Sequence, residues 1–256
     1  MKRKNSRVWR PFVLVNMAMS ADGKIATANR AVSSFGSRRD HDHLLALRAT
    51  ADAVMAGART VSAHPVDLGP GPARFRRLRQ RRGLAEYNLR VIVSGRGRIP
   101  PDARVFQRRF SPVIVLVTSR ATRAARQRLR AAGAHVKVCG RDAVNLRAAL
   151  RWLRERWGVK RLVCEGGGEL NDAMFRADLV DEVHLTVCPL VFGGRAAPTI
   201  ADGVGARVLP GARAFRLKSA RRVENELFLV YERDLTRAPR RRPAGPAQGT
   251  PLKRIR

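Results

Sequence analysis

Short apolar runs alternate with helix-like segments along this chain, and this alternation restricts the possible folds more than any other feature. The runs at 91–93 (VIV) and 112–118 (PVIVLVT) are apolar at nearly every position. Strands of this kind are buried on both faces, as they are when helices cover both sides of a sheet. Strands alternating with helices predict a mainly parallel sheet with right-handed crossovers. We therefore expect a three-layer α/β/α domain.

The other elements are predicted from caps, breakers and periodicity. Ser37 and Asp40 resemble a capping box, with Asp in place of the usual Glu, which marks a helix start. Gly133 and Gly158 are suited to end helices, because glycine readily adopts the left-handed C-cap conformation. Residues 63–88, rich in Pro, Gly and Arg, predict a long exposed connection with at most a short basic helix. Further strands are expected at 13–19, 51–57, 135–139, 160–164 and 183–188, a closing antiparallel pair at 216–221 and 226–233, and helices at 120–132, 145–157 and 170–176.

The two ends of the chain differ in composition from the region between them. Residues 1–10 and 236–256 are basic and poor in apolar residues, and we expect the second of these tails to be disordered. One domain is expected between them, at 11–235. Pro11 and Asn16 interrupt the apolar run after the N-terminal tail, so this run predicts a buried strand and not a signal peptide. No apolar stretch approaches membrane-spanning length, and a soluble protein is expected.

The formal net charge of +32 is extreme. Such a charge attracts polyanions, including phosphorylated small molecules, dinucleotides and, non-specifically, nucleic acid. The arginines are spread along the chain and no reading motif is visible, which favours solvated charge over a nucleic-acid interface. Cys139, Cys164 and Cys188 are far apart and predict buried reduced thiols in a cytoplasmic protein. The histidines show no metal-ligand spacing, so no metal is expected.

A glycine-rich turn follows the expected strand at 160–164. Gly166, Gly167 and Gly168 stand between this strand and a helix. Glycines let the backbone approach a pyrophosphate closely, and a helix N-terminus offers free N–H groups to anions. Neither the Rossmann spacing nor a P-loop is present, so a tight packing turn is the alternative. Glu165 lies at the carboxyl end of the strand, where open α/β sheets place ligands.

A second polar group follows the expected strand at 13–19. Asp22 and Lys24 flank a glycine, just after Ser20. A carboxylate and an amine so placed suit orientation of a hydroxylated substrate or exchange of a proton, which makes Asp22 and Lys24 candidate catalytic residues. An ordinary Asp-Gly turn is the alternative.

A third group surrounds the expected strand at 51–57. Arg48 closes a helix, where its guanidinium could bind a phosphate or complement the helix dipole. Gly57 and Thr60 stand where this strand passes into a loop. Thr60 is suited to cap a helix or to bind a cofactor oxygen.

Four ordered blocks, at 19–26 (MSADGKIA), 47–61, 165–170 (EGGGEL) and 179–194, together resemble the riboflavin-biosynthesis pyrimidine reductases. This family is the C-terminal reductase domain of the bifunctional deaminase–reductase and has a dihydrofolate-reductase-like fold. The ordered set is far more specific than any single block. The resemblance implies NADPH-dependent hydride transfer to C1′ of a ribosylaminopyrimidine 5′-phosphate, giving the ribitylamino product. The enzyme type is 5-amino-6-(5-phosphoribosylamino)uracil reductase.

The resemblance also implies roles for individual residues. Met19 is expected beside the nicotinamide, and Arg48 near the 5′-phosphate of the substrate. The implied cofactor contacts are Met19, Gly57, Thr60, Gly166, Gly167, Gly168, Glu169 and Leu170, and the implied substrate contacts are Ser20, Arg48, Leu68 and Glu165.

The chain departs from the family pattern in two places. The acidic residue usual after Thr60 is replaced around His64, and Ser94-Gly95 stands where Asp-Ser is usual. These changes leave the identity of the pyrimidine open. The zinc signature of the deaminase that often precedes this reductase is absent. We therefore expect a stand-alone reductase or a paralogue with another substrate.

Two alternatives stay open at this stage. The chain could reduce a pterin or another heterocycle, or it could be a non-catalytic basic protein that binds nucleic acid. No aromatics interleave the basic tails for base stacking, which counts against nucleic-acid binding. The family usually forms homodimers, which makes a dimer an expectation as well.

Overall fold

The computed structural model describes residues 9–31, 35–63 and 65–236. The tails expected at 1–10 and 236–256 lie almost wholly outside the described residues, and so does His64.

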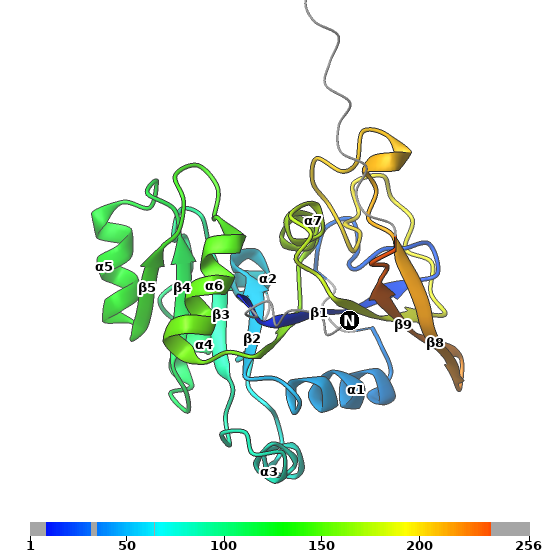
Figure 1. The fold of residues 1–256 in the computed structure, drawn as a ribbon, viewed down its shortest axis with the longest axis horizontal. Helices are drawn as coiled ribbons and strands as arrows, with labels where there is room; N and C mark the ends of the chain where they lie inside the picture. Colours follow the sequence, from blue (N-terminus) through cyan, green and yellow to red (C-terminus); the bar gives the residue numbers. More distant parts are fainter. Residues whose placement is uncertain (1–8, 32–34, 64, 237–256) are drawn as a thin grey trace, which may run out of the picture.

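The described residues form one mostly parallel sheet of nine strands in the order β5-β4-β3-β2-β6-β1-β7-β9-β8 (Figure 1). All neighbours from β5 to β7 pair in parallel, whereas β9 pairs antiparallel with β7 and with β8. The predicted parallel sheet with a closing antiparallel pair is therefore confirmed. The strands are β1 Phe12–Ser20, β2 Ala53–Gly57, β3 Leu89–Val93, β4 Val113–Val117, β5 Ala134–Val138, β6 Arg161–Cys164, β7 Glu182–Cys188, β8 Phe215–Val223 and β9 Glu226–Arg233.

Helices cover both faces of the sheet. In β2, Ala53 and Met55 point to one apolar layer, and Val54 and Ala56 point to the other. The first layer packs against α6 and α7, and the second against α1, α2, α4 and α5, which confirms three layers. The helices are α1 Arg38–Arg48, α2 Ala58–Ala63, α3 Ala73–Arg81, α4 Arg104–Gln107, α5 Arg123–Ala131, α6 Leu146–Trp157 and α7 Gly168–Arg176, with a 3₁₀ turn at Leu209–Gly211.

The start of α1 differs in one detail from the predicted capping box. Ser37 is the N-cap, and its hydroxyl accepts from the Arg39 and Asp40 N–H groups, as expected. The Ser37 N–H, however, donates to Glu226 Oε1 at 2.8 Å and not to Asp40. Because β9 supplies this carboxylate, that of Asp40 is left to face the interior.

The connection between α2 and β3 was expected to be exposed, but part of it is buried. Leu68 and Phe75 are buried, and Arg79 is 1% exposed. The Arg79 guanidinium donates to Arg48 O at 2.7 Å and to Ala51 O at 2.6 Å. Carbonyls at the C-terminus of a helix lack intrahelical partners, and a cation satisfies them well. Composition predicted the short basic helix, but not that its arginine would support α1 from inside.

The three cysteines, Cys139, Cys164 and Cys188, are buried free thiols, as expected. Burial raises the pKa of the Cys164 thiol to about 12. Within the described ranges, no helix is both long enough and apolar enough to span a membrane.

Candidate active site

A cleft of about 1290 Å³ opens along the carboxyl ends of β1, β2, β3 and β6. Open α/β sheets bind their ligands outside this edge. The glycine turn before α7, the loop 65–69 and the inner face of α1 line the cleft together. It therefore brings together sequence blocks that lie more than 100 residues apart.

The glycine turn has one side against the protein and one side open. Gly166 has φ +75°, and a Cβ there would lie 2.9 Å from Met17 Sδ. Its carbonyl accepts from the Gly57 N–H at 2.6 Å. Gly167, in contrast, would place a Cβ no closer to another residue than 3.6 Å, at Thr60 Oγ1. Gly167 is also the N-cap of α7, and no side chain caps that helix. The open side thus presents bare backbone and a helix N-terminus, as an anion requires.

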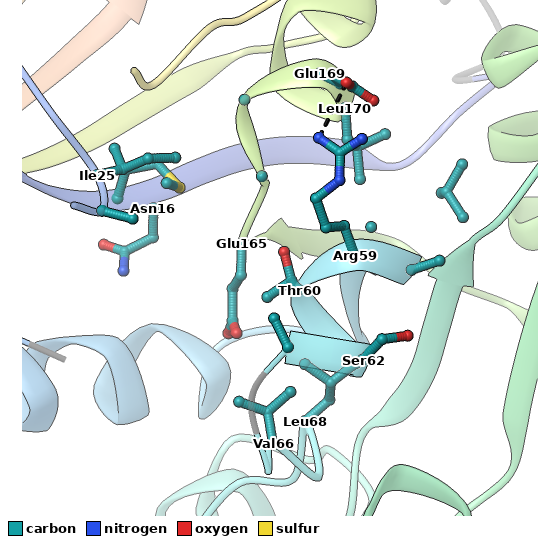
Figure 2. Close-up of a pocket in the computed structure, with 18 of the residues that line it drawn as sticks. Asn16, Ile25, Arg59, Thr60, Ser62, Val66, Leu68, Glu165, Glu169 and Leu170 are labelled. Atoms are coloured by element: carbon teal, nitrogen blue, oxygen red, sulfur yellow. Dashed lines mark hydrogen bonds and ion pairs between the residues drawn. The ribbon is translucent and has the colours of Figure 1, made fainter. Parts of the chain in front are cut away.

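Thr60 and Arg59 stand opposite this turn on α2. Figure 2 shows the Thr60 hydroxyl pointing toward the middle of the cleft. Arg59 Nη1 contacts Glu169 Oε1 at 3.0 Å across the cleft, and both side chains are largely exposed (Figure 2). An exposed pair of this kind contributes little stability and opens readily. Arg59 is a cleft cation that sequence reasoning did not single out.

Gly168 gives a direct test of how tightly this turn packs. A Cβ at Gly168 would lie 2.6 Å from Thr199 O and 2.8 Å from Asp202 Oδ2. We expect Gly168→Ala to lower the free energy of unfolding by about 1–3 kcal/mol, because a backbone oxygen cannot move aside easily. Gly167→Asn, which adds a favoured N-cap in open space, should not lower it. Urea denaturation measures both, and a Gly168→Ala protein as stable as wild type would contradict this packing.

A buried ion pair forms the floor of the cleft. Arg48 Nε and Nη2 donate to the two Glu165 carboxylate oxygens at 2.6 and 2.7 Å, and Arg48 Nη1 donates to Gly69 O at 2.6 Å. The two side chains are 9% and 11% exposed. Burial opposes the charge on Arg48, but Glu165 outweighs it, so the pKa of Arg48 lies above its usual value. Two predicted substrate residues are thus bound to each other. Each of the three guanidinium nitrogens of Arg48 already donates a hydrogen bond within the protein.

Leu68 also lines the cleft, at 1% exposure. Its φ is +58°, in the left-handed region that a leucine seldom adopts. The Asn88 amide donates to the Leu68 carbonyl at 2.9 Å and so helps to hold it there. Gly57, Glu169 and Leu170 line the same cleft.

The residues that follow Ala18 are placed differently. Met19, Ser20, Asp22 and Lys24 are not among the cleft-lining residues; Met19 packs against the core. The Ser20 hydroxyl donates to Asp22 Oδ1 at 2.6 Å. Asp22 also accepts the Phe192 and Gly193 N–H groups at 3.1 and 2.8 Å.

Through these hydrogen bonds, Asp22 connects the turn after β1 to the loop at Phe192 and Gly193. The Ser20 hydroxyl, and to a lesser extent the two N–H groups, lower the pKa of Asp22 to about 2, although desolvation acts in the opposite direction. An aspartate that is ionised at neutral pH is poorly suited to deliver a proton. The geometry therefore favours the alternative considered for this segment, a turn, and the catalytic roles of Asp22 and Lys24 stay untested predictions.

Asn16 is the main cleft residue that sequence reasoning missed. It is 7% exposed and lines the cleft from β1. Its signal in the sequence was a polar residue inside an otherwise apolar strand. This polar residue argued against a signal peptide, but its type alone did not indicate a position in the cleft.

A family model described as the RibD C-terminal domain matches residues 11–229. The chain belongs to this family. The resemblance drawn from the sequence is thereby confirmed. Two relatives, from Archaeoglobus fulgidus and Methanothermobacter thermautotrophicus, are both named 2,5-diamino-6-ribosylamino-4(3H)-pyrimidinone 5′-phosphate reductase. They are 37% and 35% identical to this chain, over 76% and 87% of it and 87% and 98% of their own lengths.

The fold of the RibD C-terminal domain family also appears among solved structures. RibD of Acinetobacter baumannii superposes with a TM-score of 0.72 at 21% identity, over 89% of this chain and 59% of that one. At this identity the likeness concerns the fold alone, and it supports the dihydrofolate-reductase-like architecture.

Proposed function

We propose that this protein is an NADPH-dependent reductase that converts a ribosylaminopyrimidine 5′-phosphate into its ribitylamino form, as in riboflavin biosynthesis. The observation that carries the proposal is that one cleft contains both candidate binding features. It joins an uncapped, glycine-lined helix start to a buried Arg48–Glu165 floor. The names of the two archaeal relatives agree with this chemistry.

The glycine turn fits a dinucleotide pyrophosphate. The open side of Gly167 leaves room for an anion at van der Waals distance from the backbone. Thr60 faces the same space from α2. In this assignment Gly167 and the first turn of α7 hold the pyrophosphate, and Arg59 exchanges Glu169 for a phosphate. Choice of the phosphorylated dinucleotide is favoured by further exposed arginines along the cleft, Arg98 and Arg104.

The bound nicotinamide supplies the hydride, and the protein need only orient its partners. Glu165 lies to the left of Thr60 in Figure 2, and its partner Arg48 is the last residue of α1. We assign this side to the substrate. Because Arg48 is committed to Glu165 and Gly69, the exposed Arg30 at the rim is better placed to add charge for the 5′-phosphate. Direct binding of the phosphate by Arg48 stays a prediction.

One experiment tests the function. NADPH is mixed with the purified protein and the 2,5-diamino-6-ribosylamino-pyrimidinone 5′-phosphate, and the absorbance of the reduced cofactor is followed. We expect oxidation that depends on substrate and a lower rate with NADH. A dihydropterin serves as the control for the alternative heterocycle reductase, and salt-dependent polynucleotide binding without NADPH affinity would favour the nucleic-acid alternative. Cofactor binding without turnover of the pyrimidine would reject the proposed substrate.

The remaining properties belong to the same proposal. We place the reductase domain at 11–235 and the protein in the cytoplasm. We also propose a homodimer, as is usual in the family. Leu217 and Leu227, in the edge strand β8 and its neighbour β9, are 55% and 45% exposed and offer apolar surface for an association. Size-exclusion chromatography with light scattering measures the oligomeric state.

A further inference from the structure

All three tryptophans of the chain lie in or against one helix. Trp152 and Trp157 belong to α6, and Trp9, which precedes β1, lies beside the same helix. The guanidinium groups of Arg147 and Arg151, both in α6, lie 5.8 and 5.7 Å from the centre of the Trp9 ring. Trp9 is 37% exposed, and the other two tryptophans are partly exposed. A chain poor in aromatic residues thus collects its largest rings at one surface.

Cations accompany these rings across α6 and onto the edge strand β5. Lys137 Nζ lies 5.4 Å from the centre of the Trp152 ring. The rings of His135 and Trp157 meet edge to face, with their centres 5.2 Å apart. Because His135 and Lys137 are two positions apart in β5, both extend to the same side of the strand. Rings and cations therefore continue from Trp9 to the edge of the sheet, at the end of the molecule opposite β8 (Figure 1). We call the residues of these two paragraphs the α6 surface.

The positive charge of the α6 surface has few carboxylates to balance it. Arg147 donates to the Ala177 carbonyl at 2.5 Å, and within the described part of the chain neither Arg147 nor Arg151 pairs with a carboxylate. Like charges four positions apart on a helix repel each other. Residues 119–160 include twelve Lys and Arg but only two acidic residues, one of which, Asp142, already pairs with Arg120. A polyanion bound here relieves this repulsion.

We propose that the α6 surface binds single-stranded nucleic acid, an activity separate from the reduction in the cleft. Single strands are bound by cations that follow the phosphates and by aromatic rings on which bases stack. Cation–π contacts at exposed sites are weak, so a base can replace a guanidinium on a ring while that guanidinium moves to a phosphate. Sequence order does not show this combination, because Trp9 and α6 lie far apart in the chain.

Two observations separate this surface from other uses. The apolar face of α6, with Leu146, Leu150 and Leu153, is buried, so the helix has no apolar face to insert into an anionic membrane. Trp9 and Arg151 are not among the residues that line the cleft. Binding of a single strand therefore does not require the reductase site.

The first test titrates oligothymidylate of about 16 nucleotides into the full chain and follows the intrinsic tryptophan fluorescence. Because every tryptophan lies at the α6 surface, stacking of bases should quench a large part of the emission. Heparin, a polyanion without bases, and a DNA duplex of the same length, whose bases already stack on each other, should quench much less. Quenching by heparin or the duplex equal to that by the single strand, or no quenching by the single strand, overturns the inference.

The second test separates cations from rings by anisotropy of a labelled oligothymidylate at several salt concentrations. For single strands, the logarithm of the binding constant falls with that of the salt concentration by about 0.7 per neutralised phosphate. Arg147→Gln/Arg151→Gln should therefore reduce this slope by about 1.4. Trp9→Leu should weaken binding roughly 10-fold without changing the slope.

Arg77→Gln/Arg81→Gln is the matched control for charge. These two arginines of α3 are also exposed and four positions apart, so the variant has the same net charge as the α6 double variant. It should keep the wild-type slope. Equal slopes for the two double variants, or wild-type affinity in Trp9→Leu, would place the binding elsewhere and overturn the inference. All of these variants should oxidise NADPH at the wild-type rate, because the substituted residues do not line the cleft, so failure of this inference leaves the reductase standing.

Discussion

Gly167→Asp should weaken NADPH binding about 100-fold or more while leaving the fold intact. Gly167 has φ −66° at the N-cap of α7, a conformation any residue adopts, and a Cβ there meets only Thr60 Oγ1 at 3.6 Å. Aspartate is among the best N-caps, so the variant should be at least as stable as wild type. Its carboxylate, however, takes the N–H groups that the pyrophosphate needs and repels it. At about 4 Å this repulsion amounts to roughly 1–4 kcal/mol, in addition to the lost bonds.

Fluorescence titration of NADPH measures the effect, and thermal unfolding checks the fold. Gly167→Asn is the matched control, because it caps the helix with a side chain of the same size but without charge. It should lose clearly less affinity than Gly167→Asp. If both variants bound NADPH as tightly as the wild type, the assignment of the pyrophosphate to this turn would be wrong.

Glu165→Leu should be the most destabilising single change in the cleft, with a loss of about 3–5 kcal/mol. It leaves the Arg48 guanidinium buried and without its carboxylate. An arginine cannot shed its proton to escape this cost. Arg48→Met should cost less, because the stranded Glu165 can take up a proton and become neutral. The double variant should recover much of the loss, since a buried pair is often replaceable by apolar residues of similar volume.

Urea denaturation of the two single variants and the double variant gives the coupling energy. The exposed pair Arg120–Asp142, with a contact of 2.6 Å, is the matched control. Its side chains are 54% and 63% exposed, so Asp142→Ala should cost no more than about 1 kcal/mol. A Glu165→Leu protein within 1 kcal/mol of wild type would show that the floor of the cleft does not depend on this pair.

Local pattern predicted the sheet well and the connections poorly. The strand β4 is apolar on both faces wherever it is placed, so its burial could be predicted from composition alone. Arg79 shows the opposite case. Its burial depends on the free carbonyls of Arg48 and Ala51, which come together only when α3 folds back on α1. No local signal distinguishes it from the many solvated arginines around it.

The cleft residues also divide into those that could be recognised from the sequence and those that could not. The glycine turn and Thr60 were recognised because backbone freedom and a hydroxyl at a strand end are visible as residue types in order. The pairing of Arg48 with Glu165 was not, because 117 residues separate them and both were assigned to a substrate. Asn16 was noticed in the sequence, but only the structure shows that it lines the cleft and that its Oδ1 atom has no hydrogen-bond partner among the described residues.

The sequence by itself determined the layered α/β architecture, the family and the position of the glycine turn that we propose binds a phosphate. These depend on periodicity and on residue types that act through their own backbone. Only the tertiary structure decided which charged and polar groups satisfy one another and which are left for a ligand. That division depends on distances between strands far apart in the chain.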